Sequence, residues 1–269
     1  AAIPWLAAVG QRTPSVLLGT SVLTPTMRYE PSVIAQAFAT MGQLTPGRIF
    51  LGVGTGEALN ERPATGVEMP GRKERRLRLA EAIELIRRLW TEERVDFEGS
   101  FYRTVQATVY DRPEEPVPIY VAASGPKATD LAGRAGDGMI GVAPVKDTIE
   151  QYESAGGRGK PKYAEVQVCY HENENEARRI ATAWWPNIAM GGQLGQDLAL
   201  PSHYEAIADL VSEDDVATTV ACGPDPEKHL ESIKRFTDAG YDHLAVHQIG
   251  PHQVPFFSFY ETEILPKVS

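Results

Sequence analysis

Cysteine is scarce in this sequence, and the cysteines present do not form a binding or cross-linking pattern. Only Cys169 and Cys222 occur among 269 residues, and neither stands at a short spacing from the other or from a histidine. Structural zinc sites and disulfide frameworks need short, repeated spacings, so neither is expected to organise this fold. Both cysteines are predicted to be buried free thiols.

Long apolar runs and clusters of positive charge are missing too. No stretch reaches the roughly 18 consecutive apolar residues that a membrane-spanning helix needs. The formal net charge is -10, and no basic stripe runs along the chain. A protein that grips a phosphate backbone needs such a stripe, so nucleic acid is not an expected partner. We expect a soluble, cytoplasmic protein without a membrane partner.

The remaining composition is that of an ordinary globular protein. Hydrophobic residues make up 42% and charged residues 23% of the chain, both near the averages for folded domains. A chain of 269 residues is long enough for one large α/β domain, so a single domain over residues 1–269 is predicted. Residues 1–13 show the pattern of an amphipathic helix and not of a signal peptide.

Strand-like and helix-like segments alternate along the chain, which is typical of a parallel α/β fold. Strands are predicted at Ser15–Val22, Arg48–Val53, Val117–Ala123, Gly138–Ala143, Glu165–Tyr170 and His243–His247. Helices are predicted at Pro31–Met41, Arg72–Trp90, Pro126–Ala135, Glu174–Trp185, Asp225–Ala239 and Val254–Leu265. The segment RVDFEGSFYRT, which follows the second of these helices, predicts an inserted surface hairpin.

Such a strand pattern fits either a flavodoxin-like sheet or part of an eight-stranded barrel. The stretch from Trp184 to Val220 contains no clear strand, and barrels tolerate long connections of this kind on their catalytic face. The predicted fold class is therefore α/β, a (βα)8 TIM barrel with a hairpin and helical insertions. Its first strands would precede Ala1.

The stretch LGVGTGEALN, residues 51–60, places three glycines and one acid where a buried strand is expected to end. Gly52 and Gly54 alternate with apolar residues, which leaves room for a flat ring or another backbone. In α/β folds the carboxyl ends of the strands hold the site, and Glu57 could hold or deliver a proton there. Alternatively, the glycines only turn the chain and Glu57 is solvated. A dinucleotide site is disfavoured because the strand-helix-strand fingerprint is incomplete.

Two more predicted strand ends carry small or hydroxyl-bearing residues. In YVAASGPKA, residues 120–128, Ser124 and Gly125 precede Pro126, which suits the first turn of a helix. Backbone amides at such a helix start can bind a phosphate, although an ordinary helix cap is the alternative. The stretch LGTSVLTPT, residues 18–26, ends a strand with several hydroxyl groups. Three such strand ends predict one shared pocket.

Histidine and tryptophan give weaker signals. The six histidines form neither an H-x-x-x-H nor an H-E-x-x-H array, so no metal site is predicted. His247 and Gln248 end the last predicted strand, where barrels place polar side chains, but a histidine packed beneath a loop is the alternative. Trp184 and Trp185 are predicted to pack at a helix end, with a substrate wall as the alternative.

Several of these segments together resemble the family of coenzyme F420-dependent glucose-6-phosphate dehydrogenases, which are luciferase-like (βα)8 barrels. The resemblance runs from Ala1 to the C-terminus and rests on LLGTSVLTPTMRYEPSVIAQAFATMG, RIFLGVGTGEALNE, RVDFEGSFYR, PIYVAASGPKA, AGRAGDGMIG and GYDHLAVHQIGP. It implies an oxidoreductase that uses F420, a deazaflavin that carries a hydride. An Asp-His pair and a nearby tryptophan of the family would precede Ala1.

The resemblance also implies roles for particular residues. Glu57 matches the acid that handles the proton at the deazaflavin, and the peptide bond between Ser21 and Val22 matches a non-proline cis bond. Contacts with the ring and ribityl chain are implied for Ser21, Val22, Thr24, Thr55, Gly56 and Asn60. Contacts with the phosphate and tail are implied for Ser124, Gly125, Lys127 and Ala128.

The positions that match the family's substrate pocket are Val142, Val145 and Thr219. Family members clamp the phosphate of glucose 6-phosphate with two lysines and an arginine, which align with Val145, Gly195 and Thr219. Losing charge-assisted contacts that are worth roughly 1.5–3 kcal/mol each disfavours a phosphorylated substrate, although Lys146 adjoins the first position. A small, uncharged alcohol or carbonyl substrate is expected instead, and the relatives suggest a homodimer.

Two other functions stay open at this point. One is an FMN-dependent monooxygenase of the bacterial luciferase type, which shares the barrel. The other is a cofactor-binding protein without turnover, because the sequence as written has no Asp-His pair to take the substrate hydroxyl proton.

Overall fold

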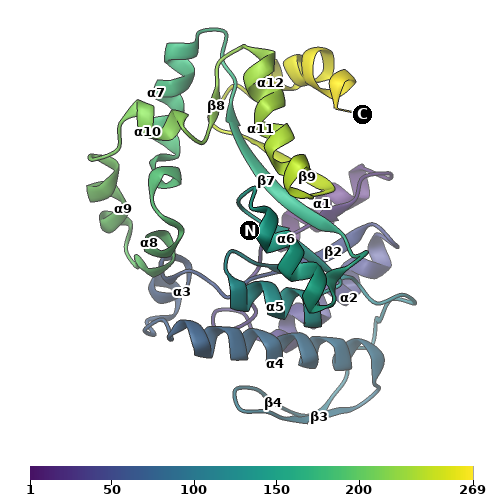
Figure 1. Ribbon diagram of the computed structural model, residues 1–269. Coiled ribbons are helices and arrows are strands. Elements are labelled where there is room, and N and C mark those ends of the chain that lie inside the picture. The colour runs from purple at the N-terminus through teal and green to yellow at the C-terminus, as the bar shows by residue number, and fades with distance from the viewer. Residues whose placement is uncertain (269) are drawn as a thin grey trace. The chain divides into compact units, whose positions relative to one another are not determined.

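The computed structural model describes residues 1–268 of the chain and shows the predicted alternation of strands and helices (Figure 1). The chain divides into two compact units. Unit 1 comprises residues 1–56, 60–140 and 150–161, and unit 2 comprises residues 57–59, 141–149 and the chain from 162 onward. A single domain over residues 1–269 stays a prediction, because two compact units can fold together or apart.

Unit 1 is built on a parallel sheet. Its strands lie in the order β1 (Leu18–Gly19), β2 (Ile49–Val53), β5 (Ile119–Ala122) and β6 (Gly138–Gly141). Every residue of β2 is buried, as expected for a strand with neighbours on both edges and helices on its faces. The pairing is in register with Leu51 opposite Ile119 and Val121 opposite Met139, so the carboxyl ends of these strands share one edge.

The helices begin and end close to their predicted bounds. Those that were predicted are α1 (Ala2–Arg12), α2 (Pro31–Leu44), α4 (Arg72–Thr91), α5 (Pro126–Ala135), α7 (Glu174–Trp184) and α11 (Pro226–Ala239). The structure adds α3 (Ala58–Thr65), α6 (Lys146–Tyr152) and η1 (Glu153–Gly157), which were not predicted. Proline at the first helical position explains the sharp starts of α2, α5 and α11. An amide hydrogen at this position would have no partner within the helix, so proline, which lacks one, loses nothing there. Gly240 adopts the left-handed conformation that ends α11.

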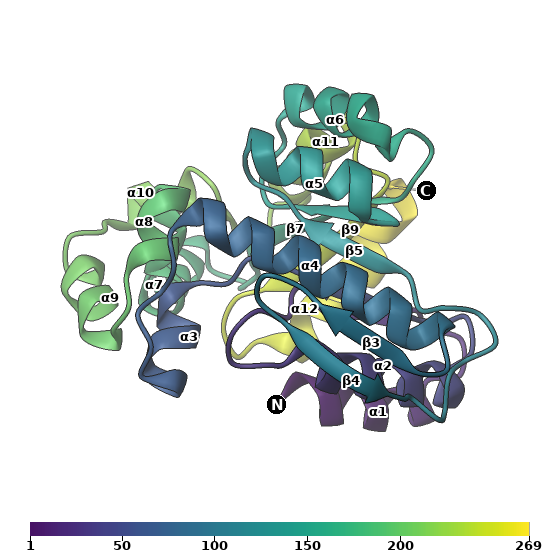
Figure 2. The same ribbon diagram turned by 90° about the horizontal axis from the view of Figure 1, so that it is seen from below.

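The predicted hairpin is confirmed. It consists of the antiparallel strands β3 (Val95–Glu98) and β4 (Arg103–Ala107). Figure 2 shows this hairpin beside α4. Glu81 of α4 accepts hydrogen bonds from the backbone amides of Ser100, Phe101 and Tyr102, which fixes the hairpin turn on the helix.

Unit 2 contains β7 (Lys162–Cys169), which pairs in parallel with both β8 (Ala221–Cys222) and β9 (His243–Gln248). β8 was not predicted, because no strand-like run was recognised around it in the sequence. Its residue Cys222 lies opposite Cys169 of β7. Both cysteines are buried free thiols, as predicted.

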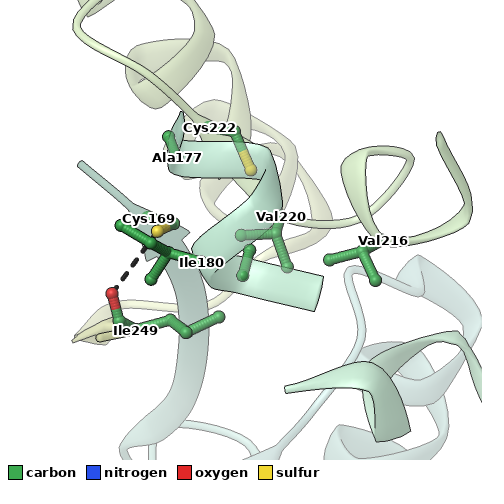
Figure 3. Close-up of a cluster of buried hydrophobic side chains, with 8 residues drawn as sticks. Cys169, Ala177, Ile180, Val216, Val220, Cys222 and Ile249 are labelled. Carbon is green, nitrogen blue, oxygen red and sulfur yellow. Dashed lines mark hydrogen bonds between the residues drawn. The ribbon is translucent and has the colours of Figure 1, made fainter. Parts of the chain in front are cut away.

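The core of unit 2 packs one face of α7 against the ends of these strands (Figure 3). The Cys169 thiol donates to the carbonyl oxygen of Ile249 over 3.4 Å. The buried members of this cluster are Cys169, Ala177, Ile180, Ala181, Val216, Val220, Cys222 and Ile249. Trp185 packs against the same cluster, which confirms its predicted place at a helix end.

The long connection before β8 is helical, as the predicted insertions require. It contains η2 (Pro186–Ala189), α8 (Gly192–Asp197), α9 (Pro201–Ala208) and α10 (Glu213–Ala217). The predicted last helix is instead broken into α12 (Gln253–Phe259), a π-helical turn η3 (Tyr260–Ile264) and a 3-10 turn η4 (Leu265–Lys267). Within residues 1–268, no helix is both long and apolar enough to cross a bilayer.

Candidate functional site

Three turns leave the same edge of the sheet in unit 1, as the sequence predicts. They follow β1, β2 and β5, which are neighbours in this order. The first two turns are joined by their backbones: the Leu23 amide donates to Gly52 O over 2.9 Å and the Gly54 amide donates to Leu23 O over 2.8 Å. This arrangement brings together the strand ends that were predicted to form one pocket.

The first turn contains the cis peptide bond between Ser21 and Val22 that the family resemblance implies. Ser21 is exposed, Val22 is half-buried and Thr24 is buried. A Cβ atom built at Gly54 would lie 2.7 Å from the Val22 Cγ2 atom, so the second turn needs glycine at this position to pass the first.

The second turn places Gly56 directly beside Thr24. Gly56 has a φ of +84°, and a Cβ atom there would lie 2.7 Å from the Thr24 Cγ2 atom. Both the conformation and the contact require glycine. Thr55 is half-buried, and Asn60 is exposed in the first turn of α3. Thr24, Thr55 and Gly56 thus lie in two adjoining turns, and Asn60 lies in the helix that follows the second.

The third turn presents open backbone at the start of α5. Gly125 caps this helix in an extended conformation, and a Cβ atom built on it would meet nothing within 4 Å. Ser124 and Lys127 are exposed, and Ala128 is half-buried. Here the Ala128 amide donates to Gly125 O over 3.0 Å, and Pro126 has no amide hydrogen. The other amides at the start of a helix carry a partial positive charge, which is the chemistry of an anion site.

Glu57 directly follows Gly56 in the chain and is grouped with unit 2. Its side chain reaches solvent, yet the protein around it is dense enough that desolvation raises the pKa of its carboxyl group. Tyr204 of α9 interacts electrostatically with Glu57. Burial raises the pKa of Tyr204, and the negative charge of Glu57 raises that pKa further. A carboxyl group that holds its proton more tightly than usual is suited to proton transfer near neutral pH.

The predicted substrate residues occupy different positions relative to the strands. Val142 follows β6 and Val145 precedes α6, and their exposed fractions are 60% and 46%. Thr219 is exposed as well, but it precedes β8 and therefore lies toward the amino end of that strand. Because barrel sites form at carboxyl ends, the position of Thr219 does not support a role in the pocket.

His247 has partners that account for it structurally. Its Nδ1 atom lies 3.2 Å from Glu165 Oε1, and its ring meets the Trp185 ring edge-on at 4.8 Å between centroids. The hydrogen bond from His247 lowers the pKa of Glu165. This geometry favours a packed, hydrogen-bonded histidine over a metal ligand. Trp184 was also predicted to pack at the helix end, and this was wrong, because its exposed fraction is 61%.

Sequence reasoning missed three buried polar residues near the first two turns: Glu61, Arg75 and Tyr102. Arg75 lies within RKERRLR, a charged run that normally indicates a solvated helix face. Glu61 carries no pattern that separates it from the other acids of the loop region. Their roles become visible only in the folded structure, where each of them forms a hydrogen bond with a main-chain atom of another segment.

Comparison with known proteins gives concordant results. The family described as luciferase-like monooxygenase matches residues 1–243. Two proteins named F420-dependent glucose-6-phosphate dehydrogenase are similar along the whole chain. The one from Nakamurella multipartita is 46% identical over 100% of this chain and 82% of its own length. The one from Segniliparus rotundus is 44% identical over 99% of this chain and 83% of its own length.

Solved structures show the same fold. An F420-dependent secondary alcohol dehydrogenase in complex with an F420-acetone adduct superposes with a TM-score of 0.91 and 29% identity, over 100% of this chain and 84% of that one. The F420-dependent tetrahydromethanopterin reductase from Methanopyrus kandleri superposes with a TM-score of 0.81 and 20% identity, over 100% of this chain and 88% of that one. The second match supports the fold alone.

Proposed function

We propose that this chain, which belongs to the luciferase-like monooxygenase family and within it to the F420-dependent glucose-6-phosphate dehydrogenases, transfers a hydride between coenzyme F420 and a small alcohol or carbonyl compound. That the chain is an F420-dependent oxidoreductase follows from its family. The observation that supports its cofactor site is the convergence of three glycine- and hydroxyl-bearing turns at one sheet edge in unit 1.

The residues of these turns fit the cofactor. Ser21, Val22, Thr24, Thr55, Gly56 and Asn60 would contact the deazaflavin ring and the ribityl chain. Ser124, Gly125, Lys127 and Ala128 would hold the phosphate and tail, because the start of α5 offers backbone amides and open space. When bound, F420 supplies a two-electron acceptor or donor of hydride. The protein supplies orientation and protons.

Glu57 is the proposed proton carrier. Its carboxyl group has a raised pKa, so a larger share of it stays protonated near neutral pH than for an ordinary glutamate. Oxidation of an alcohol releases one hydride, which F420 would accept when bound, and one hydroxyl proton, which would leave to solvent. A proton held by the protein would then neutralise the charge that the hydride brings to the cofactor. The proposed role of Glu57 is to hold that proton at its carboxyl oxygen and to deliver it.

The substrate is proposed to be uncharged. Val142 and Val145 expose apolar side chains at positions where the resemblance implies a substrate pocket, and Val145 aligns with one of the cations that clamp a phosphate in the family. The solved alcohol dehydrogenase with its acetone adduct shows that the same fold accepts a small ketone. The curated relatives are named for glucose 6-phosphate, so the decisive experiment compares the two substrate classes directly.

Cofactor binding is tested by titrating the purified protein with F420 and following the quenching of cofactor fluorescence, with FMN as the competing ligand. We expect saturable F420 binding in the micromolar range and no retention of FMN. FMN that copurifies with the protein would favour the luciferase-type monooxygenase. Light scattering on the same preparation tests the proposed homodimer.

Substrate class is tested with the F420-loaded protein and three compounds: 2-propanol, cyclohexanol and glucose 6-phosphate. We expect reduction of F420 with the secondary alcohols at a kcat/KM above that for glucose 6-phosphate. The reverse order would overturn the proposed substrate class while leaving the oxidoreductase assignment intact. F420 binding without turnover of any substrate would support a binding protein.

A further inference from the structure

Two charged side chains are buried in unit 1 next to the first two turns. Glu61 of α3 has no exposed surface, and Arg75 of α4 is 2% exposed. Charged residues are almost never buried to this degree unless specific partners compensate for the lost hydration. The partners of these two side chains therefore indicate what their burial achieves.

Glu61 holds the first turn by its backbone. Its Oε2 atom accepts a hydrogen bond from the Arg28 amide over 2.9 Å, and its Oε1 atom lies 3.7 Å from the Arg28 guanidinium. Arg28 ends the short segment TPTMR, residues 24–28, which begins with the proposed cofactor residue Thr24. Glu61 thus fixes one end of this segment.

Arg75 holds the second turn by its backbone. Its Nη1 atom donates to the carbonyl oxygen of Gly56 over 3.0 Å. Gly56 in turn packs against Thr24, and a Cβ atom built at Gly56 would lie 3.4 Å from the Glu61 Cγ atom. The two buried charges therefore act on adjoining pieces of backbone: Arg75 on Gly56 itself, and Glu61 on the segment that begins with Thr24.

We propose that Glu61 and Arg75 are positioning residues for the cofactor: they fix the spacing of Thr24 and Gly56 before the ligand arrives. This inference rests on the proposed cofactor site. Neither residue needs to touch the cofactor, because both act through the backbone that would contact it. Binding is tighter when the loops are already ordered, since the ligand then loses less free energy in ordering them.

The same helix provides a matched control for a general role in stability. Arg87 of α4 donates from Nη2 to Ala135 O over 2.9 Å and pairs with Asp137 over 2.8 Å. It thus also links α4 to a backbone carbonyl, but at the C-terminal end of α5, opposite the end that carries the third turn. Loss of Arg87 should weaken the fold without changing the cofactor loops.

The experiment compares Arg75→Met, Arg75→Lys, Glu61→Gln and Arg87→Met in the full chain. Urea unfolding gives stability, fluorescence quenching gives the Kd for F420, and hydrogen exchange of the ligand-free protein reports the order of residues 24–28 and 54–57. We expect R75M to raise the Kd by about tenfold or more, E61Q to raise it by a smaller factor because glutamine keeps one oxygen acceptor, and both variants to speed exchange in those two segments. R75K should recover part of the affinity, because it keeps one donor. R87M should lose stability but keep the Kd within about twofold.

Two results would overturn the inference alone: R75M and E61Q binding F420 as tightly as the wild type, or R87M weakening binding equally. If R75M does not fold, E61Q and R75K decide, and wild-type affinity in both would overturn the inference. Failure of the wild-type protein to bind F420 would overturn the proposed function, and the inference with it.

Discussion

The hydroxyl group of Tyr102 lies 3.1 Å from the carbonyl oxygen of Thr26, to which it donates a hydrogen bond across 76 residues of sequence. It also approaches the carbonyl oxygen of Pro25 at 3.5 Å. Tyr102 directly precedes the second hairpin strand, and burial raises its pKa, so the phenol stays protonated and remains a donor. The inserted hairpin thus braces the first turn of the proposed cofactor site.

Replacing Tyr102 with phenylalanine removes only this hydroxyl group. We expect the free energy of unfolding to fall by about 1 kcal/mol, the usual net value of one hydrogen bond, and the affinity for F420 to fall several-fold. Urea unfolding and fluorescence titration measure the two effects. The control is Tyr110→Phe, because Tyr110 is 93% exposed and should change neither quantity. Equal effects of both variants would contradict the bracing role.

Gly125→Ala tests the phosphate part of the proposed site. A methyl group fits there without contact in the protein, so stability should change by less than about 1 kcal/mol, the scale of a helix-cap preference. The methyl group would occupy space meant for the cofactor, and we expect a weaker affinity for F420. Gly191→Ala is the matched control, since Gly191 also caps a helix and also has nothing within 4 Å of a built Cβ atom. Unchanged F420 affinity in G125A would place the phosphate elsewhere.

Glu57→Gln tests the proton carrier. We expect kcat for alcohol oxidation to fall about 100-fold or more, within the range of lost general acid catalysis, with little change in the Kd for F420. The acid form is the active one in this direction, so the wild-type rate should fall as the pH rises through the pKa of Glu57, which lies above 4.5. This limb should be absent in E57Q. Glu68→Gln, at an exposed surface ion pair, should keep the wild-type profile. An unchanged pH profile in E57Q would assign the proton to another group.

His229 predicts a pH dependence of stability. It is buried, with Nε2 3.0 Å from Gly223 O and Nδ1 3.0 Å from the Tyr260 hydroxyl, and burial lowers its pKa below 6.5. Below pH 6.5 the unfolded chain binds a proton that the folded chain refuses, so stability falls with falling pH until the folded pKa is reached.

The contribution of this one group cannot exceed about 1.4 kcal/mol per pH unit. In His229→Gln we expect lower stability at pH 8 but a shallower loss between pH 6.5 and 5, measured by urea unfolding at a series of pH values. The exposed His203→Gln variant should follow the wild type. A slope in H229Q as steep as that of the wild type would assign the acid sensitivity to other groups.

Thiol labelling tests the core of unit 2. Burial raises the pKa of Cys169 to about 12 and that of Cys222 to about 11, and the thiolate is the reactive form. We expect both thiols to react with a disulfide reagent only as fast as the protein opens, and rapidly in urea. Immediate labelling of the native protein would show that this core is loosely packed.

The fold was predictable where periodic patterns are long. The helix from Pro126 to Ala135 was predicted to the residue, because proline starts it and Gly136 ends it. β1 and β8 have two residues each; β1 was predicted as the longer strand Ser15–Val22, which was too long, and no strand-like run was recognised around β8. The last helix was predicted as continuous because apolar spacing cannot reveal a local π-helical turn. The family resemblance is confirmed by the comparisons.

The site was predictable where backbone geometry requires a particular residue type. Glycines at 54 and 56 and the small residues before Pro126 are visible in sequence as unusual composition at strand ends. The residues that hold these turns in place are not visible in the sequence. Arg75 and Tyr102 donate to main-chain carbonyls far away in sequence, and a single sequence does not show such contacts. The place of Thr219 before β8 was not predictable either, because β8 itself was not recognised in the sequence.

Arg75, Glu61 and Tyr102 all grip main-chain atoms, and every amino acid other than proline offers the same amide and carbonyl groups. The turns are therefore held through their main chain, and a side chain such as that of Thr55 is not needed to keep them in place. Laboratory libraries randomised at such positions should yield mostly well-folded members, and altered ligand preference could be selected there without repairing the scaffold each time.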